Sequence, residues 1–302
     1  RSAGRLVGEV EKTEFMDDRA VPGLRYRYWV VPRNEHGEGP ARSCDLRVEP
    51  PAWKLRSNED DGIARLTGPE SPLRKHMRLA FYGDSITDNS DYARVLREAV
   101  ASSEHTDDRE VVFLNRGING GKAEDLLLGI RRWGAGGGLA DPLPFHEQLA
   151  ADDPDVAVIY VGVNEPNDLP ARDYPSGPVD HASPPTTDED FRAHLTTLVR
   201  AAQGAGARVV IATPSVNGEL PAGENPLDAR LDALAQVVRD VAAAESAELV
   251  DLREAFQAWL DDHVEERARA GALTADGVHP NERGARLTAE LVAAGIARVL
   301  QD

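Results

Sequence analysis

Five short apolar runs, each rich in β-branched residues, recur from Met77 onward and constrain the fold more than any other feature of the chain. They read MRLAFYG, EVVFLNRG, DVAVIYVG, RVVIATP and AELVDL. Runs of this length with almost no alternation are typical of parallel strands that are buried on both faces. Helical stretches lie between or after them, with apolar residues at three- and four-residue spacing: DYARVLREAVAS, DEDFRAHLTTLVRAAQ, LDARLDALAQVVRDVAAAE and NERGARLTAELVAAGIARVLQ. The pattern predicts a three-layer α/β sandwich with a five-stranded parallel sheet over residues 77–302.

Residues 1–50 have a different pattern, in which short segments are separated by turn sequences. The segments RLVGEVEKTEF, LRYRYWVVPRN and ARSCDLRVEP predict a small all-β piece. The run VPGLRYRYWVVPRNEHGEGPA resembles the second half of a fibronectin type III module, which implies that Tyr26 is the tyrosine-corner residue. Because half a β-sandwich leaves an apolar face uncovered, either further strands have been removed or this piece packs on the next domain. Residues 51–76, rich in proline, glycine and charge, are predicted to be a linker.

Polar and glycine-containing runs follow the first three predicted strands, and another precedes the last predicted helix. They place Ser85 in GDS, Gly120 in NRGINGG, Asn164 in GVNE, and Asp276 and His279 in DGVHP. Each residue has an ordinary structural explanation, such as a helix cap for the GDS turn or a tight turn at Gly120. However, a parallel sheet brings the carboxyl ends of its strands to one edge, where ligands bind in open α/β folds. We therefore expect these residues to lie close together.

Their side chains have the chemistry that ester hydrolysis requires. A serine hydroxyl is a weak nucleophile at neutral pH and needs a neighbouring base, commonly a histidine that a carboxylate holds in place. The spacing Asp276-x-x-His279 can supply both groups from one turn of chain. The oxygen of an attacked ester carbonyl becomes negative, so donors must already point at its position. The backbone N–H groups of Ser85 and Gly120 and the side-chain amide of Asn164 can supply three.

These four runs, in this order, resemble the conserved blocks of the SGNH hydrolases, also called GDSL esterases and lipases. The resemblance covers about residues 77–302 and implies a flavodoxin-like sheet that hydrolyses esters or thioesters without a metal or organic cofactor. It implies Ser85 as the nucleophile, His279 as the base and Asp276 as the residue that orients it. The oxyanion hole would consist of Ser85, Gly120 and Asn164.

The chain departs from the family pattern at two places. The third block usually reads Gly-x-Asn-Asp, whereas Glu165 occupies the last position here, which leaves the support of Asn164 open. The small hydroxyl residue that usually follows the second-block glycine is replaced by Gly121 and Lys122, so the substrate fit near Gly120 is expected to differ.

Charge narrows the choice of partners. The net charge is −18, and residues 1–50 contribute none of it because their acidic and basic residues balance. Such a surface repels phosphate backbones and anionic lipids, so nucleic acid is not expected as a partner. No apolar run is long enough to span a bilayer.

The single Cys44 predicts neither an internal disulfide nor a metal site, and we expect it to be buried or half-buried. The oligomeric state is left open.

The sequence thus predicts a serine esterase that removes acetyl or other short acyl groups from a carbohydrate or similar polar alcohol. A lipase or thioesterase for longer acyl chains is one alternative, and a non-catalytic carbohydrate-binding protein on the same fold is another. The chain begins at Arg1 without a signal-like segment, which suggests that the natural N-terminus is cut away or not shown. Secretion from a bacterium is expected only by analogy with fibronectin-linked polysaccharide-degrading enzymes.

Overall fold

The computed structural model describes residues 25–34, 37–47, 62–131, 142–166, 186–221, 224–264 and 270–301. By its internal contacts the chain divides into two units, Arg1–Lys54 and Leu55–Asp302. The larger unit contains the site, and the smaller one is a β segment.

The five apolar runs form one parallel sheet, as the sequence predicts. Its strands are β5 (Arg78–Gly83), β6 (Val112–Gly117), β7 (Val156–Tyr160), β8 (Arg208–Ala212) and β9 (Glu248–Val250). Their order across the sheet is β6-β5-β7-β8-β9. This is the flavodoxin-like order, in which the chain moves to one side of the first strand and then to the other. The carboxyl end of that first strand, β5, is therefore the point where a site is expected.

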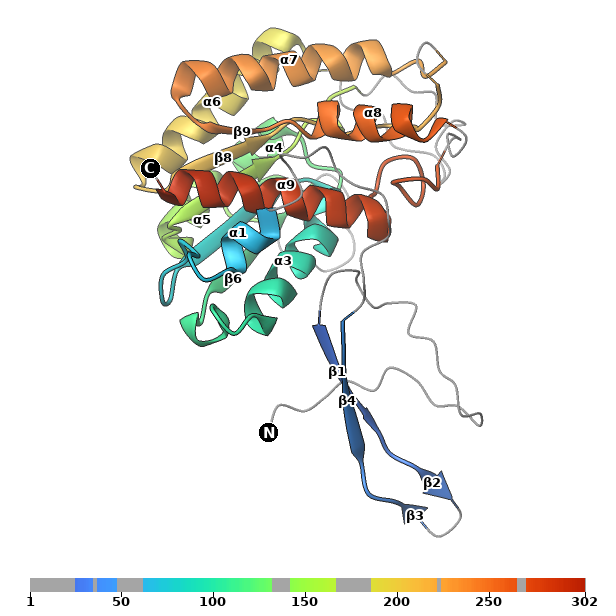
Figure 1. The fold of residues 1–302 in the computed structure, drawn as a ribbon. Helices are drawn as coiled ribbons and strands as arrows, with labels where there is room; N and C mark the ends of the chain where they lie inside the picture. Colours follow the sequence, from blue (N-terminus) through green and yellow to red (C-terminus); the bar gives the residue numbers. More distant parts are fainter. Residues whose placement is uncertain are drawn as a thin grey trace. The chain divides into compact units, whose positions relative to one another are not determined.

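Helices cover both faces of this sheet (Figure 1). They are α1 (Gly62–Thr67), α2 (Ser85–Asp88), α3 (Asp91–Ser102), α4 (Ala123–Leu128), α5 (Phe145–Asp152), α6 (Asp188–Gly204), α7 (Asp228–Glu245), α8 (Leu252–Asp262) and α9 (Glu282–Gln301), with a short 3-10 turn η1 (Asp107–Arg109). Helices α1 and α3 pack against α9 on one face, and α4, α5 and α7 pack against α6 on the other. The fold class predicted from the sequence is confirmed.

Strand β5 shows why its sequence has no alternation. Phe81 makes an edge contact with Tyr92 of α3, with ring centroids 5.9 Å apart. Its neighbour Tyr82 makes an edge contact with Phe145 of α5 at 4.9 Å. Successive side chains of a strand point to opposite faces, and here both faces are covered by helices. Apolar side chains are therefore required at the four consecutive positions from Leu79 to Tyr82, which are all buried.

The predicted linker over residues 51–76 differs from the structure in its second half. Residues 62–76 contain α1 and belong to the α/β unit, where Leu66 and Leu73 are buried and α1 packs on α9. The composition of this segment is polar, but a few apolar side chains at helical spacing are enough to attach it to the core. Residues 51–61 lie outside the described residues.

The smaller unit contains two antiparallel pairs, β1 (Arg25–Val30) with β4 (Arg42–Arg47), and β2 (Arg33–Asn34) with β3 (Gly37–Glu38). The predicted strand over residues 5–15 and the side chain of Tyr26 lie outside what the structure describes. Cys44 is exposed, so the expectation that it is buried or half-buried is wrong. Within the described residues this unit consists of two-stranded ribbons, and a ribbon without a second layer cannot bury a small side chain.

The sequence also predicts two long loops, at residues 133–145 and 165–190, because neither segment has a strand or helix pattern. They fall largely on residues 132–141 and 167–185, which are outside the described ranges. Among the described residues, no helix is both long enough and apolar enough to cross a bilayer.

Candidate active site

Ser85 lies where β5 ends and α2 begins. Asp84 is the N-cap of α2, and its Oδ1 accepts a hydrogen bond from the N–H of Ile86 at 2.9 Å. Ser85 is the first residue of the helix, a position whose N–H has no acceptor within the helix. The helix-cap interpretation of the GDS turn therefore holds for Asp84, while the hydroxyl and the N–H of Ser85 are left for other partners.

Gly83 allows this turn to lie close to the neighbouring strand. A Cβ at this position would lie 2.3 Å from the carbonyl oxygen of Tyr160 and 2.3 Å from Oγ1 of Thr87. Because both atoms belong to packed and buried residues, neither can move away cheaply. The glycine before Asp84 is thus required by the close approach of β5, β7 and α2.

The structure brings Ser85, His279 and Asp276 together. Nε2 of His279 lies 2.9 Å from Oγ of Ser85. Nδ1 of the same ring lies 2.7 Å from Oδ2 of Asp276. If Nδ1 carries the proton toward the carboxylate, Nε2 is an acceptor for the serine hydroxyl. This is the geometry that a serine nucleophile activated by a histidine requires.

Asp276 is held by its own turn. Its Oδ1 accepts hydrogen bonds from the N–H groups of Val278 at 3.0 Å and His279 at 2.8 Å. Partial burial alone would raise the pKa of Asp276, but the hydrogen bonds from the His279 ring and from these N–H groups outweigh it and hold the pKa below its usual value. The carboxylate therefore stays ionised beside the imidazole.

Gly120 lies in a tight turn after β6. The N–H of Gly121 donates to the carbonyl oxygen of Ile118 at 2.8 Å, and Gly120 has a φ of +68°, in the left-handed region that favours glycine. The amide Nδ2 of Asn164 donates to the carbonyl oxygen of Gly121 at 3.1 Å. Asn164 thus contacts the turn that carries Gly120.

The register of the sheet explains why these turns meet. Gly83 at the end of β5 is paired with Gly117 of β6 and with Tyr160 of β7. Because the three strands end at the same level, the turns that follow them begin side by side. The sequence analysis expected this arrangement because a parallel sheet brings the carboxyl ends of its strands to one edge.

Glu165 occupies the position where the family pattern has aspartate. It is fully buried, and its Oε1 accepts a hydrogen bond from the N–H of Ala123, the first residue of α4, at 2.9 Å. Burial raises the pKa of its carboxyl group. The longer side chain thus still connects the Asn164 turn to the segment that follows Gly120. Lys122 is also buried, and its Nζ donates to Oγ1 of Thr186 at 3.3 Å.

Asp84 has an unusual electrostatic environment. It is fully buried, and no hydrogen bond from the described residues reaches its Oδ2. Burial raises the pKa of Asp84 to about 7, against the lowering effects of the Ile86 N–H and the charge of His279. The sequence motif predicted a cap at this position but contained no signal for this shift.

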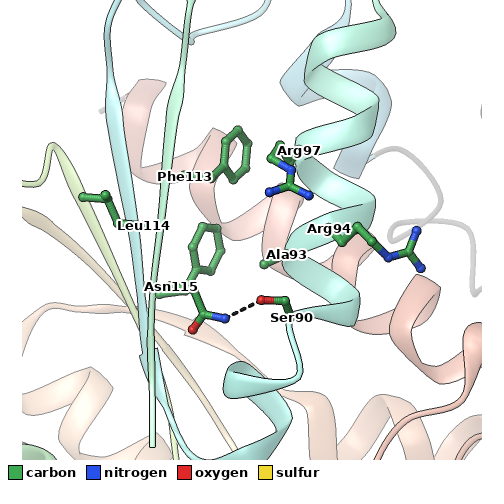
Figure 2. Close-up of a pocket in the computed structure, with 8 residues that line it drawn as sticks. Ser90, Ala93, Arg94, Arg97, Phe113, Leu114 and Asn115 are labelled. Atoms are coloured by element: carbon green, nitrogen blue, oxygen red, sulfur yellow. Dashed lines mark hydrogen bonds between the residues drawn. The ribbon is translucent and has the colours of Figure 1, made fainter. Parts of the chain in front are cut away.

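A separate small pocket lies between α3 and the edge strand β6 (Figure 2). Figure 2 shows Ala93, Arg94 and Arg97 projecting from α3, opposite Phe113 on β6, and a hydrogen bond from Asn115 to Ser90. Arg94 pairs with Glu98 on its own helix at 3.2 Å. This pocket contains none of the predicted site residues.

No cluster of histidine, cysteine, aspartate and glutamate suited to holding a metal ion occurs within the described ranges. The arrangement at the strand ends can perform nucleophilic chemistry with its own side chains.

Comparison with known proteins gives a consistent result. The model of the GDSL-like Lipase/Acylhydrolase family matches residues 81–287. A search of curated protein sequences found no match. The solved structure of the acetyl xylan esterase AlAXEase is 25% identical, with a TM-score of 0.58, over 72% of this chain and 98% of that one.

Two further structures are similar in fold. Axe2, an acetylxylan esterase from Geobacillus stearothermophilus, is 20% identical over 74% of this chain and 96% of its own, with a TM-score of 0.57. LAE5, an α/β hydrolase from the metagenome of Lake Arreo, is 21% identical over 78% of this chain and 100% of its own, with a TM-score of 0.57. The family model covers more than half of the chain, so the chain belongs to the GDSL-like lipase/acylhydrolase family and is a carboxylic ester hydrolase.

Proposed function

We propose that this chain is a serine esterase that acts through an acyl-enzyme and removes acetyl or other short acyl groups from a carbohydrate or similar polar alcohol. The observation that carries the proposal is the pair of contacts made by His279, 2.9 Å to the Ser85 hydroxyl and 2.7 Å to the Asp276 carboxylate.

In the proposed reaction, Oγ of Ser85 attacks the ester carbonyl while its proton passes to Nε2 of His279. Asp276 stabilises the imidazolium that forms. The imidazolium then donates its proton to the departing alcohol oxygen, which leaves an acyl group on Ser85. A water molecule, deprotonated by His279, attacks this acyl group and releases the carboxylic acid, and the proton returns to Ser85.

The negative charge on the carbonyl oxygen is stabilised by three donors in this proposal. They are the N–H of Ser85 at the start of α2, the N–H of Gly120 in its tight turn, and the side-chain amide of Asn164. Their positions support the role, since the turns after β5, β6 and β7 begin side by side. The loss of one such donor typically lowers kcat by about 10²–10³-fold.

Two observations support a short acyl group and a polar alcohol. A solved structure that is 25% identical to this chain is an acetyl xylan esterase. The chain also has a net charge of −18, which suits a neutral polar substrate better than an anionic lipid surface.

We also propose that residues 1–50 are part of a fibronectin type III-like module. Secretion of the protein is inferred from that resemblance and is likewise a proposal. The antiparallel pairing of β1 with β4 is compatible with the second half of such a module. We expect a chain that lacks residues 1–54 to keep the same kcat and KM on a soluble ester. A large loss of activity would show that this segment contributes to catalysis.

The proposal is tested by comparing p-nitrophenyl acetate, butyrate and octanoate as substrates for the natural chain, for Ser85→Ala and for Ser102→Ala as a matched control. The hydroxyl of Ser102 donates to the carbonyl oxygen of Ala99 at the end of α3, and this hydrogen bond involves none of the proposed catalytic residues. We expect acetate to be preferred, Ser85→Ala to be inactive, and Ser102→Ala to be unchanged. Equal rates for the natural chain and Ser85→Ala would exclude Ser85 as the nucleophile.

The same experiment separates the alternatives. A strong preference for octanoate would indicate a lipase or thioesterase and exclude the short-acyl proposal. Mass spectrometry after treatment with a serine-directed phosphonate identifies the nucleophile independently of the substrate. Release of acetate from acetylated xylo-oligosaccharides then tests whether the alcohol part of the substrate can be a carbohydrate.

A further inference from the structure

Glu219 is a buried acidic residue outside the four motif runs. It lies in the segment 213–221 that follows β8, and none of its surface is exposed. The carboxylate accepts four hydrogen bonds, all from residues more than fifty positions further along the chain. The donors are the N–H groups of Ala272 (2.8 Å), Leu273 (2.8 Å) and Thr274 (2.5 Å), and the hydroxyl of Thr274 (2.7 Å).

These donors belong to the loop that carries Asp276 and His279. Residues 270–281 of this loop contain no helix or strand, only an isolated bridge between Thr274 and Pro280. Its position therefore depends on individual hydrogen bonds. Because Thr274 lies two residues before Asp276, the carboxylate of Glu219 fixes the start of the turn that presents both side chains.

The connection continues past Thr274. Its hydroxyl oxygen accepts the N–H of Gly277 at 3.1 Å while its proton goes to Glu219. The N–H of Gly218, the neighbour of Glu219, donates to the carbonyl oxygen of Gly277 at 2.7 Å. The segment around Glu219 thus holds the Asp276–His279 turn on both sides of Asp276.

The Glu219 segment is itself anchored. Asn225, which is buried ahead of α7, donates from Nδ2 to the carbonyl oxygens of Asn217 at 2.8 Å and Gly218 at 3.1 Å. Hydrogen bonds therefore connect the start of α7 to the Glu219 segment and from there to the turn that carries His279.

We propose that Glu219 is a positioning residue for the esterase reaction, which holds the Asp276–His279 turn so that the imidazole meets the Ser85 hydroxyl. The inference rests on the proposed function. A carboxylate suits this place because four donors converge on its two oxygens and it has no proton of its own to direct at them. A glutamine would direct an NH2 group toward one of these donors, and an alanine would leave all four unpaired in the interior.

The test compares Glu219→Gln, Glu219→Ala and Thr274→Val with Glu290→Gln as the matched control. Glu290 is a buried glutamate on α9 that accepts the N–H of Ile63 at 2.9 Å, so it also holds distant backbone, but at α1. We measure kcat and KM on p-nitrophenyl acetate, the thermal unfolding midpoint, and the final amount of serine labelled by a phosphonate. The last two report how much folded enzyme is present.

We expect kcat per labelled serine to fall about 10-fold in Glu219→Gln and up to about 100-fold in Glu219→Ala, because small displacements of catalytic groups have effects of this size. KM should change by less than about 3-fold, and Glu290→Gln should keep the natural kcat even if its unfolding midpoint falls. Thr274→Val, in which the hydroxyl alone is removed, should lower kcat less than Glu219→Gln. If the Glu219 variants do not fold, the kcat of Thr274→Val tests the proposal in their place.

A double-mutant cycle distinguishes positioning from general destabilisation. In a His279→Ala background, Glu219→Gln should lower the residual kcat by less than about 2-fold, since there is no imidazole left to position. The inference is overturned if Ser85→Ala is inactive while the folded Glu219 and Thr274 variants keep the natural kcat. It is also overturned if Glu219→Gln lowers kcat by the same factor in the natural chain and in the His279→Ala background. If Ser85→Ala is as active as the natural chain, the proposed function fails instead.

Discussion

The GDS turn and the loop that carries Asp276 and His279 each contain an aspartate, and the two aspartates have opposite pKa shifts. Asp84 lies in the interior with a pKa raised to about 7. Asp276 is two-fifths exposed and has a pKa below its usual value, because the His279 ring and two N–H groups stabilise its charge against the effect of partial burial. The comparison shows that the pKa values of two carboxyl groups in the candidate active site are set by their hydrogen-bond donors and their burial, and both depend on the fold.

The two segments also differ in how they are held. The GDS turn is stabilised by near neighbours, as in the hydrogen bond from Ile86 to Asp84. The loop before α9 is held by Glu219, more than fifty residues earlier in the chain. Substitutions in the two segments should therefore differ in what they change: some should lower kcat, and others should change how the free energy of unfolding depends on pH.

The largest effect is expected for His279→Ala. Without the imidazole the Ser85 hydroxyl has no base, so kcat should fall by about 10⁴-fold or more. The unfolding midpoint should change by only a few degrees, since a third of this side chain is exposed. Steady-state kinetics and calorimetry on the same preparation check both points. A variant that keeps a tenth of the natural kcat would contradict the role of His279.

Asp84→Asn should change how stability depends on pH. The folded-state pKa of about 7 lies above the unfolded value, so unfolding releases a proton between about pH 4 and 7 and stability falls as the pH rises through this range. The upper bound of this loss is about 4 kcal/mol. Asparagine keeps the cap oxygen but does not titrate, and denaturant unfolding at several pH values should therefore give a flatter curve. A curve parallel to that of the natural chain would contradict the raised pKa.

Asn164→Ala should lower kcat by about 10²–10³-fold with little change in KM, because the amide is proposed to act on the charge that develops in the transition state. Asn164 also donates to the carbonyl oxygen of Gly121, so the variant must be shown to be folded by its unfolding midpoint. If KM rises while kcat is preserved, the side chain binds the ester in its ground state and is not an oxyanion donor.

The smallest effect is expected for the acid stability of Asp276→Asn. The folded pKa of Asp276 is lowered, so its contribution is present above the unfolded pKa and is lost as the pH falls through the folded pKa. Water screens the exposed carboxylate, and the contribution should not exceed about 0.5 kcal/mol. Acid unfolding curves of the two proteins should nearly coincide at low pH and separate slightly above pH 4. A separation in the opposite direction would refute the sign of the shift.

Much of the fold could be predicted from the sequence, since local patterns carry the information. The helix predicted for the run DYARVLREAVAS has the same ends as α3, Asp91–Ser102. The five strands of the sheet were recognised from their apolar and β-branched composition. By contrast, α1 was hidden in a segment predicted to be a linker, since its six residues are too few to show a helical period.

The site was predictable only in part. The residues Ser85, Gly120, Asn164, Asp276 and His279 could be selected by their types and their places after strands or before the last helix. The support of Asn164 was left open, so the hydrogen bond that Glu165 accepts from Ala123 was not predicted, and Glu219 carried no motif at all. A lone glutamate in a turn sequence is usually a solvated charge, and no spacing rule connects it with Ala272–Thr274.

The sequence by itself determined a parallel α/β sandwich and the types of residue at its carboxyl edge, because strand and helix patterns depend on near neighbours and on burial. Only the tertiary structure decided which oxygen meets which nitrogen, and which carboxyl groups are buried. The physical reason is that a buried polar group needs a partner at hydrogen-bond distance, and that partner can come from any point of the chain.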